Sequence, residues 1–248
     1  MKILDLFSGI GGFSLGLERA GMTTVAFCEI EPYPQAILKK NFPGVPIYDD
    51  IRTLTSKRLQ ADGIGRIDLV CGGFPCQPFS SAGKHKGTDD HRYLWPEMLR
   101  IIAECRPSWV IGENSPNVLN VAFDEIKFGL EGVGYQVGEP LVIPACAVGA
   151  DHRRGRAWVC AHSDEGRLQG VGQEEVPRFA SLSEQLAGVF EVERSRRSIS
   201  EPRMLRSYHG VSGGVDRIKA LGNTVMPQIP EIIGRAILQC ERGLVTSA

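Results

Sequence analysis

The 248-residue sequence lacks the features of a membrane or secreted protein. No apolar run approaches the ~20 residues that a membrane-spanning helix needs. The opening stretch, MKILDLFSGIGG, has no long apolar segment of the signal-peptide kind, and its glycines fit a working loop better than a cleavage site. We therefore expect a cytoplasmic protein that does not associate with a membrane.

Paired cysteines are also absent. The seven cysteines are scattered and no two form a C-x-x-C pair, so a zinc site built on paired thiolates is not expected, and we predict no metal site. Six of them have mostly apolar neighbours and are predicted to be small buried hydrophobic residues: Cys28, Cys71, Cys105, Cys146, Cys160 and Cys240. Cys76 differs because of the loop around it.

Neither sign of charge dominates the composition. The sequence holds 28 Lys and Arg against 29 Asp and Glu, so net charge alone does not indicate a nucleic-acid-binding protein. Basic residues exceed acidic ones, 12 to 10, over 151–219. This bias could serve phosphate contacts, but taken alone it is better explained as a solvated, salt-bridged surface. An apolar content of 42% argues against global disorder.

Strand-like and helix-like patterns alternate through the first 161 residues. Apolar and β-branched stretches predict strands at 2–7, 23–28, 45–48, 67–71, 109–112, 136–143 and 157–161. Helical periodicity predicts helices at 13–20, 32–41, 94–102 and 121–132, and a last one over 229–240. Repeated β-α-β units predict an α/β fold with a doubly wound, mainly parallel, Rossmann-like sheet. Ligands of such sheets bind beyond the carboxyl ends of the strands.

A glycine-rich loop follows the first predicted strand. The stretch Asp5–Gly12 runs from the strand through Gly9, Gly11 and Gly12 into a helix, and glycines let a backbone approach a ligand closely. Glu29 ends the second strand, 20 residues after Gly9, where a carboxylate can accept both hydroxyls of a ribose. The pattern favours a nucleoside cofactor, with a plain structural turn as the alternative.

A second loop presents a thiol. Gly72–Ser80 comes directly after a mainly apolar strand, and its glycines and prolines place Cys76 in the cleft expected beyond the carboxyl ends of the strands. A thiol there can act as a nucleophile when its neighbours favour the thiolate. A buried structural cysteine is the alternative, which the flanking Pro75 and the polar continuation disfavour.

Three further segments carry candidate functional groups. Glu113 closes the fifth strand, where a carboxylate can exchange a proton with a substrate ring nitrogen; a helix cap or surface acid is the alternative. Arg154 and Arg156 share one strand face and can hold a carbonyl or phosphate with forked donors, unless they belong to an ordinary solvated basic run. Asn223, after Gly222, can add an amide to the cleft or simply form a turn.

In this order, the segments resemble the DNA cytosine-5 methyltransferase family over roughly residues 1–161 and 217–240. The most specific piece is Pro75-Cys76 within Gly-Phe-Pro-Cys-Gln-Pro-Phe-Ser. The resemblance implies the class I S-adenosylmethionine-dependent methyltransferase fold, with S-adenosylmethionine as cofactor. Phe7 would stack on its adenine, Ile30 would cover the other face, Glu29 would bind the ribose and Asp50 the adenine amino group. The cofactor contacts would be completed by Ser8, Gly9, Gly11, Gly12, Ile51, Pro75 and Asn223.

The resemblance also implies the reaction. Cys76 would add to carbon 6 of a cytosine flipped out of double-stranded DNA, so that carbon 5 can take the methyl group. Glu113 would stabilise the adduct at ring nitrogen 3 and the exocyclic amine, Arg156 would hold the base carbonyl, and Arg154 would support the site. DNA methylation of the restriction-modification kind is the implied role, carried out by a monomer.

The resemblance divides the chain into three parts. Residues 1–162 would form the catalytic and cofactor-binding domain, 163–214 a small variable target-recognition segment, and 215–248 a part that returns to the catalytic domain. The polar middle part has little periodicity and is short for the family. The sequence also departs from the family at Ser115, where Val is usual, and in the segment Asp151–Arg156, which lacks the usual Gln and Glu.

Three other functions stay open. One branch of the family uses the same motifs on tRNA, so a tRNA cytosine-5 methyltransferase is an alternative. A non-catalytic DNA-binding member of the fold is another, which the intact Cys76, Glu113 and Glu29 disfavour. A nicotinamide-dependent oxidoreductase is disfavoured by the incomplete glycine pattern and the lack of a hydride-transfer acid near the cleft.

Overall fold

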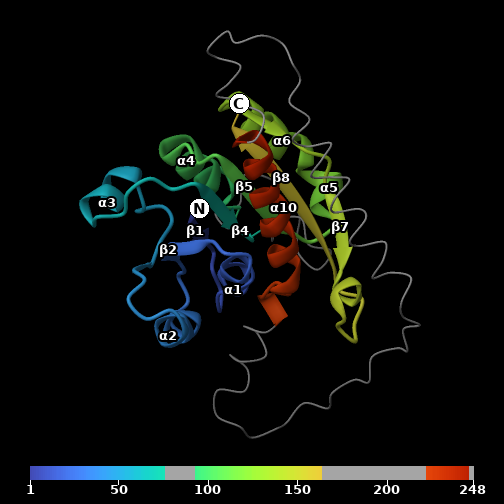
Figure 1. The fold of residues 1–248 in the computed structure, drawn as a ribbon, viewed down its shortest axis with the longest axis horizontal. Coiled ribbons are helices and arrows are strands. Elements are labelled where there is room, and N and C mark those ends of the chain that lie inside the picture. The colour runs from blue at the N-terminus through green and yellow to red at the C-terminus, as the bar shows by residue number, and fades with distance from the viewer. Residues whose placement is uncertain (76–92, 164–221, 246–248) are drawn as a thin grey trace, which may run out of the picture.

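The described part of the protein folds around one eight-stranded sheet with helices on both faces (Figure 1). The structure, a computed structural model, describes residues 1–75, 93–163 and 222–245. Seven strands follow the order β3-β2-β1-β4-β5-β8-β6, and β7 pairs with β8 beside this path. The expected doubly wound, Rossmann-like fold is confirmed.

Parallel strands make up one side of the sheet. They are β1 (Lys2–Leu6), β2 (Thr23–Cys28), β3 (Ile47–Tyr48), β4 (Leu69–Gly72) and β5 (Trp109–Asn114). Every residue of β4 and β5 is buried, as is typical of strands covered on both faces. On the other side, β8 (Gly155–Ser163) runs antiparallel to β5, β6 (Tyr135–Val137) and β7 (Leu141–Pro144).

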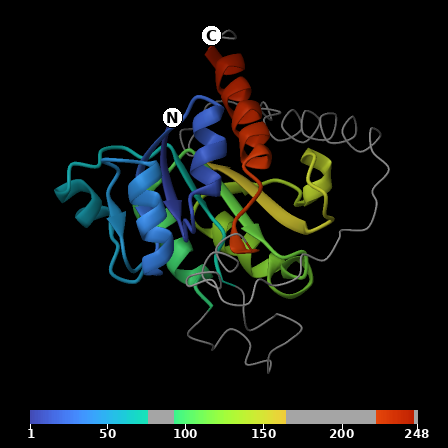
Figure 2. The same ribbon diagram turned by 90° about the horizontal axis from the view of Figure 1, so that it is seen from below.

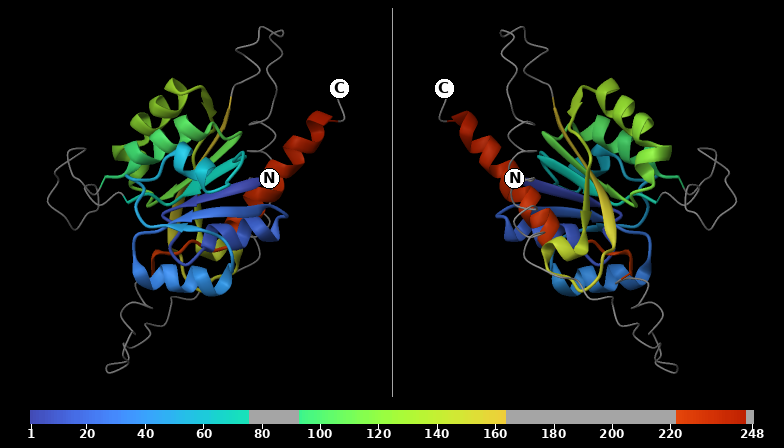
Figure 3. Two further views of the ribbon diagram at one scale, coloured as in Figure 1. Left: turned by 90° about the vertical axis from the view of Figure 1, so that its left-hand side faces the viewer. Right: turned by 90° about the vertical axis from the view of Figure 1, so that its right-hand side faces the viewer.

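Helices cover each face of the sheet (Figure 3). α1 (Gly12–Arg19) and α10 (Gln228–Val245) pack on one face, and α2 (Pro32–Asn41) lies beside α1. α4 (Trp95–Cys105), α5 (Val118–Val121) and α6 (Phe123–Gly132) cover the other, with the short α3 (Ser56–Ala61) before β4. The 3-10 helix η3 (Ala145–Val148) precedes β8.

Two glycines let α1 and α10 pack closely (Figure 2). A Cβ on Gly16 would overlap the carbonyl oxygen of Pro227, and one on Gly234 would lie 2.9 Å from Cδ2 of Leu17. This packing brings the C-terminal part of the chain back to the start of α1. There, a Cβ on Gly12 would lie 2.6 Å from Oγ1 of Thr224.

Several boundaries differ from the sequence expectations. The helix expected at 121–132 is α6, which begins at Phe123 because Ala122 leaves the helical region at φ −144°; α5 is a separate short helix before it. The strand expected at 136–143 is likewise two strands, β6 and β7. α3 was not expected at all; it begins where the Thr55 side chain accepts the Arg58 N–H.

Within the described ranges, no helix combines the length and apolarity needed to cross a membrane. The division at 162 and 214 stays a prediction, because residues 164–221 are not described.

Candidate functional site

The carboxyl ends of four parallel strands meet along one edge of the sheet. Leu6 pairs with Cys28 of β2 and with Gly72 of β4, and Gly72 pairs in turn with Gly112 of β5. The segments that leave these strands therefore start side by side, at the position where doubly wound sheets bind ligands. They include the glycine loop, Glu29, the start of the Cys76 loop and Glu113.

The glycine loop has an unusual backbone. Phe7, Gly9 and Gly11 all have positive φ, at 53°, 54° and 88°. A left-handed φ is rare for an aromatic residue and is found mostly at functional sites. Gly11 is also restricted by space, because a Cβ there would lie 2.7 Å from Cε2 of Phe42. The buried Ser8 fixes the turn by donating its hydroxyl to the Asp5 carbonyl at 2.7 Å.

The base of this loop is closed by the carboxyl group of Asp5. Its Oδ2 accepts the Ser14 hydroxyl at 2.7 Å and the Ser14 N–H at 3.3 Å. Complete burial raises the pKa of Asp5 to about 7, against the opposing effect of the Ser14 hydrogen bonds. The sequence reasoning did not identify the roles of Asp5 and Ser14, whose nine-residue separation spans the whole loop.

Glu29 is attached to the glycine loop. Its Oε2 accepts the Gly9 N–H at 2.7 Å, and its Oε1 accepts the Glu31 N–H at 2.8 Å. The side chain is largely buried, and each oxygen keeps a further lone pair. The next residue, Ile30, is 60% exposed. The carboxylate is therefore fixed and still able to accept hydroxyl donors, beside an apolar side chain open to a ligand.

Asp50 lies in a turn after β3. Its carboxylate accepts the Arg52 Nη2–H at 2.7 Å, the Nε–H at 2.9 Å and the backbone N–H at 3.0 Å. The hydrogen bond from the Arg52 side chain holds the pKa of Asp50 below its ordinary value. A ligand amino group at Asp50 would compete with Arg52, whose side chain is 55% exposed. Ile51 is buried beneath the turn.

Glu113 and Arg156 form an ion pair across β5 and β8. Nε of Arg156 lies 2.7 Å from Oε1 of Glu113. Burial raises the pKa of Glu113 to about 7, although Arg156 and Arg154 both oppose that rise. Burial and the neighbouring Arg156 lower the pKa of Arg154 below its ordinary value. Three of the four expected catalytic residues are thus electrostatically coupled.

The chain leading to Cys76 passes directly beside Glu113. A Cβ on Gly73 would lie 2.8 Å from Oε2 of Glu113, so only glycine fits without displacement. Asn114 donates its side-chain Nδ2–H to the Phe74 carbonyl at 2.9 Å. The Phe74 ring in turn packs on Trp95, with ring centroids 5.2 Å apart. The sequence did not reveal that Gly73 lies against the Glu113 carboxylate or that Trp95 packs on Phe74.

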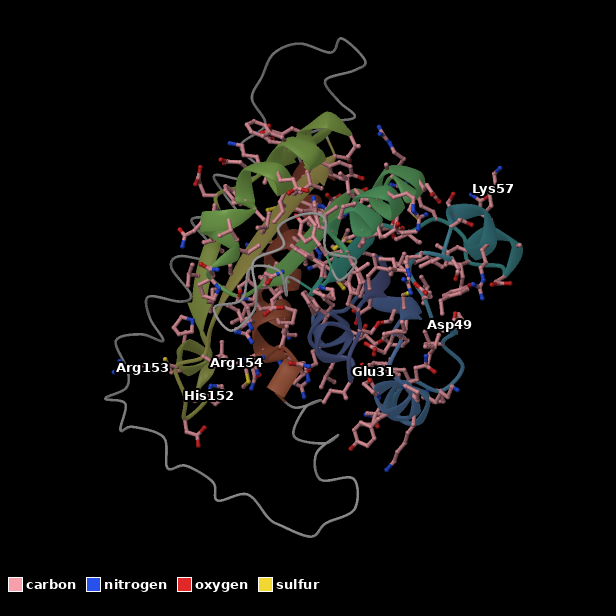
Figure 4. All side chains as sticks on the ribbon, turned by 180° about the vertical axis from the view of Figure 1, so that it is seen from behind. Glu31, Asp49, Lys57, His152, Arg153 and Arg154 are labelled. Carbon is pink, nitrogen blue, oxygen red and sulfur yellow. The ribbon has the colours of Figure 1, made fainter. Side chains whose placement is uncertain are left out.

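Some of the expected site residues make none of these contacts or lie outside the described residues. Pro75 is the last described residue of its loop, and Cys76 lies outside the described residues. Asn223 is exposed, one residue before the Thr224 that packs on Gly12. Figure 4 shows Arg154 with His152 and Arg153 near η3, away from Glu31 and Asp49 beside α2.

The other cysteines divide into two groups. Cys28, Cys71 and Cys160 are buried, as expected, whereas Cys105, Cys146 and Cys240 are only partly buried. Burial raises the pKa of Cys28 and of Cys160 to about 12, which makes both thiols poor nucleophiles. In the part of the chain that the structure describes, no cluster of His, Cys, Asp and Glu could hold a metal ion.

Comparison with known proteins identifies relatives of one kind. The sequence profile of the C-5 cytosine-specific DNA methylase family matches residues 1–209. Type II methyltransferase M2.BsuMI of Bacillus subtilis is 38% identical over 170 residues, which cover 65% of this chain and 42% of that protein. M.NgoMIV of Neisseria gonorrhoeae is 41% identical over 125 residues, covering 50% and 38% of the two chains. This chain therefore spans about two fifths of the length of these curated relatives.

Solved structures agree on the fold. A protein described as a DNA modification methyltransferase encoded within an Escherichia coli prophage is 28% identical, with a TM-score of 0.59. The match covers 71% of this chain and 50% of that one. Dnmt2 methyltransferase of S. pombe matches over 100% of this chain and 98% of its own, with a TM-score of 0.56. At 17% identity, that likeness shows the fold alone.

Proposed function

Because this chain belongs to the C-5 cytosine-specific DNA methylase family, we propose that it transfers a methyl group from S-adenosylmethionine to carbon 5 of cytosine in double-stranded DNA. Cys76 is the nucleophile, and Glu113, Arg154 and Arg156 complete the catalytic group. The observation that carries the proposal is the position of Gly73. Its backbone lies against the Glu113 carboxylate, only three residues before Cys76 in the sequence.

The residues at the strand ends fit an adenosyl cofactor. The Glu29 carboxylate, fixed by two backbone N–H groups, keeps lone pairs for the two ribose hydroxyls. Phe7 and the exposed Ile30 offer apolar faces for an adenine, and Asp50 accepts its amino group. The loop at Ser8, Gly9, Gly11 and Gly12 holds the methionine portion, and Ile51, Pro75 and Asn223 complete the cofactor site. The cofactor, when bound, supplies an electrophilic methyl group.

The side chains of the protein make carbon 5 reactive. The Cys76 thiolate adds to carbon 6 of the cytosine ring, which removes aromaticity and leaves an electron-rich carbon 5. Glu113 hydrogen-bonds to ring nitrogen 3 and the exocyclic amine. A pKa of about 7 lets its carboxyl group hold or release a proton near neutral pH. After methylation, loss of the carbon-5 proton and departure of Cys76 restore the aromatic ring.

The two arginines hold the base and the carboxylate. Arg156 already binds Oε1 of Glu113 and presents further N–H groups to the base carbonyl. Arg154 supports this ion pair from the turn before β8. The base must leave the helix to reach these groups, because stacking shields carbon 5 and carbon 6 in a duplex. The target-recognition role of 163–214 and the monomeric state stay predictions.

Covalent trapping tests the proposal. We place 5-fluorocytosine at the target site of a duplex. The fluorine on carbon 5 cannot be removed as the proton of cytosine is, so Cys76 cannot depart and the protein and DNA should remain joined after denaturation. Cys76→Ala should lose this product and methyl transfer while still binding the cofactor. Cys105→Ala, at the end of α4, is the matched control and should keep both. An adduct that persists in Cys76→Ala would refute the assignment of the nucleophile.

The substrate is tested separately. Transfer of labelled methyl groups should occur with a mixed-sequence duplex DNA and not with tRNA. Transfer to tRNA alone would mean that the substrate is tRNA and not DNA, while the proposed methylation of carbon 5 of cytosine would still hold.

A further inference from the structure

The guanidinium of Arg100, midway along α4, makes four hydrogen bonds and a further close ion-pair contact with Glu97. Nε donates to Oε2 of Glu97 at 2.8 Å, and Nη2 lies 2.8 Å from the same oxygen. Nη1 donates to Oε1 of Glu104 at 2.8 Å and to the Leu54 carbonyl at 2.9 Å, and Nη2 donates to the Ile51 carbonyl at 2.8 Å. Four of the five N–H groups of the arginine are therefore hydrogen-bonded, and Nη2 also pairs with Glu97.

The two carbonyl groups belong to the turn after β3. The side chains of Ile51 and Leu54 are buried there. The turn is therefore held both by the packing of these side chains and by the hydrogen bonds from Arg100 to the two carbonyl groups. Glu104 extends the link, because its Oε2 accepts the N–H of Ser56, the first residue of α3, at 2.8 Å. One arginine and one glutamate of α4 therefore hold the whole stretch from Ile51 to Ser56.

One peptide group connects Arg100 to the carboxylate of Asp50. The peptide between Ile51 and Arg52 presents its carbonyl to Arg100, at 2.8 Å, and its N–H to Oδ1 of Asp50, at 3.0 Å. A peptide group is planar, with its carbonyl and N–H pointing in opposite directions. Fixing the carbonyl therefore fixes the N–H that orients the Asp50 carboxylate.

We propose that Arg100 is a positioning residue for the adenine-binding part of the cofactor site. It acts through the peptide between Ile51 and Arg52 and holds Asp50 at the angle that accepts an exocyclic amino group. This inference rests on the proposed function, because it takes Asp50 as the group that recognises adenine. Lysine cannot replace Arg100, since an ammonium has three donors and no planar fork.

The test compares two ligands that differ at the recognised amino group and in the protonation of the adjacent ring nitrogen. S-inosylhomocysteine carries a ring carbonyl where S-adenosylhomocysteine carries that amine. In calorimetric titrations, the wild-type protein should bind the adenosyl ligand at least about tenfold more tightly. In Arg100→Lys this preference should fall to about threefold or less, because Asp50 is no longer held in place. A purely stabilising role would weaken both ligands alike and leave their ratio unchanged.

Two further variants complete the design. Arg235→Lys alters an arginine of α10 that pairs with Glu231 at 2.9 Å, and it should keep the wild-type preference. Glu104→Gln keeps the Arg100 guanidinium but weakens its hydrogen bond to residue 104. Its preference for the adenosyl ligand should lie between those of the wild-type protein and Arg100→Lys. If Arg100→Lys does not fold, as judged by thermal melting, Glu104→Gln decides: a wild-type preference there overturns the inference.

Failure of this inference can be told apart from failure of the proposed function. A wild-type preference that persists in both α4 variants overturns the role of Arg100 and leaves the methyltransferase proposal standing. Equal binding of the two ligands by the wild-type protein overturns the Asp50 assignment and this inference with it. Binding of neither ligand by the wild-type protein overturns both proposals.

Discussion

The Nε atom of Arg156 lies 2.7 Å from Oε1 of Glu113, which leaves the second carboxylate oxygen turned toward Gly73. The ion pair fixes the side chain in one orientation, while burial raises the pKa of Glu113 to about 7. The carboxyl group is therefore held rigidly and titrates near neutral pH. Such a group can donate a hydrogen bond or proton to a ring nitrogen at one stage of a reaction and accept it back at another.

Gly73→Ala should impair methyl transfer more than folding. The new Cβ would lie 2.8 Å from Oε2 of Glu113, so either the carboxylate or the loop leading to Cys76 must move. Because small misplacements of reacting groups are costly, we expect kcat to fall about 10²-fold. Steady-state kinetics measures this. Gly65→Ala, where the nearest atom would be Lys2 Nζ at 3.8 Å, is the control, and equal kcat values in both variants would contradict the prediction.

Glu29→Ala should weaken cofactor binding. It removes the acceptor for the ribose hydroxyls and also the partner of the Gly9 N–H, so the loop is held at the end of β2 only by the hydrogen bonds from Ser8 to the Cys28 carbonyl. Loss of hydrogen bonds to a charged group predicts a Kd for S-adenosylmethionine raised by about tenfold to a hundredfold in calorimetry. Glu125→Gln, an exposed acid in the first turn of α6, serves as control. A wild-type Kd in Glu29→Ala would remove Glu29 from the cofactor site.

Gly16→Ala should destabilise the fold, because its Cβ would overlap the Pro227 carbonyl at the contact between α1 and α10. Backbone cannot yield as a flexible side chain can, so we expect a loss of about 2 kcal/mol in the free energy of unfolding, measured by urea denaturation. In Gly132→Ala, at the end of α6, the Cβ meets open space, and stability should change by less than about 1 kcal/mol. Similar values for the two variants would argue against close packing of α1 on α10.

Asp5→Asn should change how stability depends on pH. Burial raises the pKa of Asp5 from 3.8 to about 7, so the folded protein holds this proton more tightly than the unfolded chain. The resulting stabilisation is complete below pH 3.8 and is lost as the pH rises through 7. Relative to Asp5→Asn, the wild-type protein should therefore lose about 2 kcal/mol between pH 5 and pH 8, as measured by urea denaturation. A difference that stays constant with pH would show that Asp5 is ionised throughout.

Local patterns predicted most of the architecture. The strand at Thr23–Cys28 and the helix at Pro32–Asn41 have the bounds that periodicity and the flanking residues indicated. Each is specified by neighbours within a few positions, such as the proline at the first helical residue. α3 escaped notice because six residues give too little periodicity to detect.

The residues that support the site could not be predicted in this way. Arg100 has the sequence signal of a helix-surface residue, with glutamates three positions before and four after it, a pattern that usually marks an exposed salt bridge. Its contacts with Ile51 and Leu54 depend on how α4 sits against a turn about 50 residues earlier.

The sequence by itself determined the order of strands and helices, the family, and which side chains carry the proposed chemistry, because those depend on residue type and on spacing along the chain. The tertiary structure decided which groups meet: Glu113 with Arg156, Glu29 with Gly9, Asp5 with Ser14, and α1 with α10. It also decided the protonation of buried carboxyl groups, because desolvation arises only when distant segments close around them.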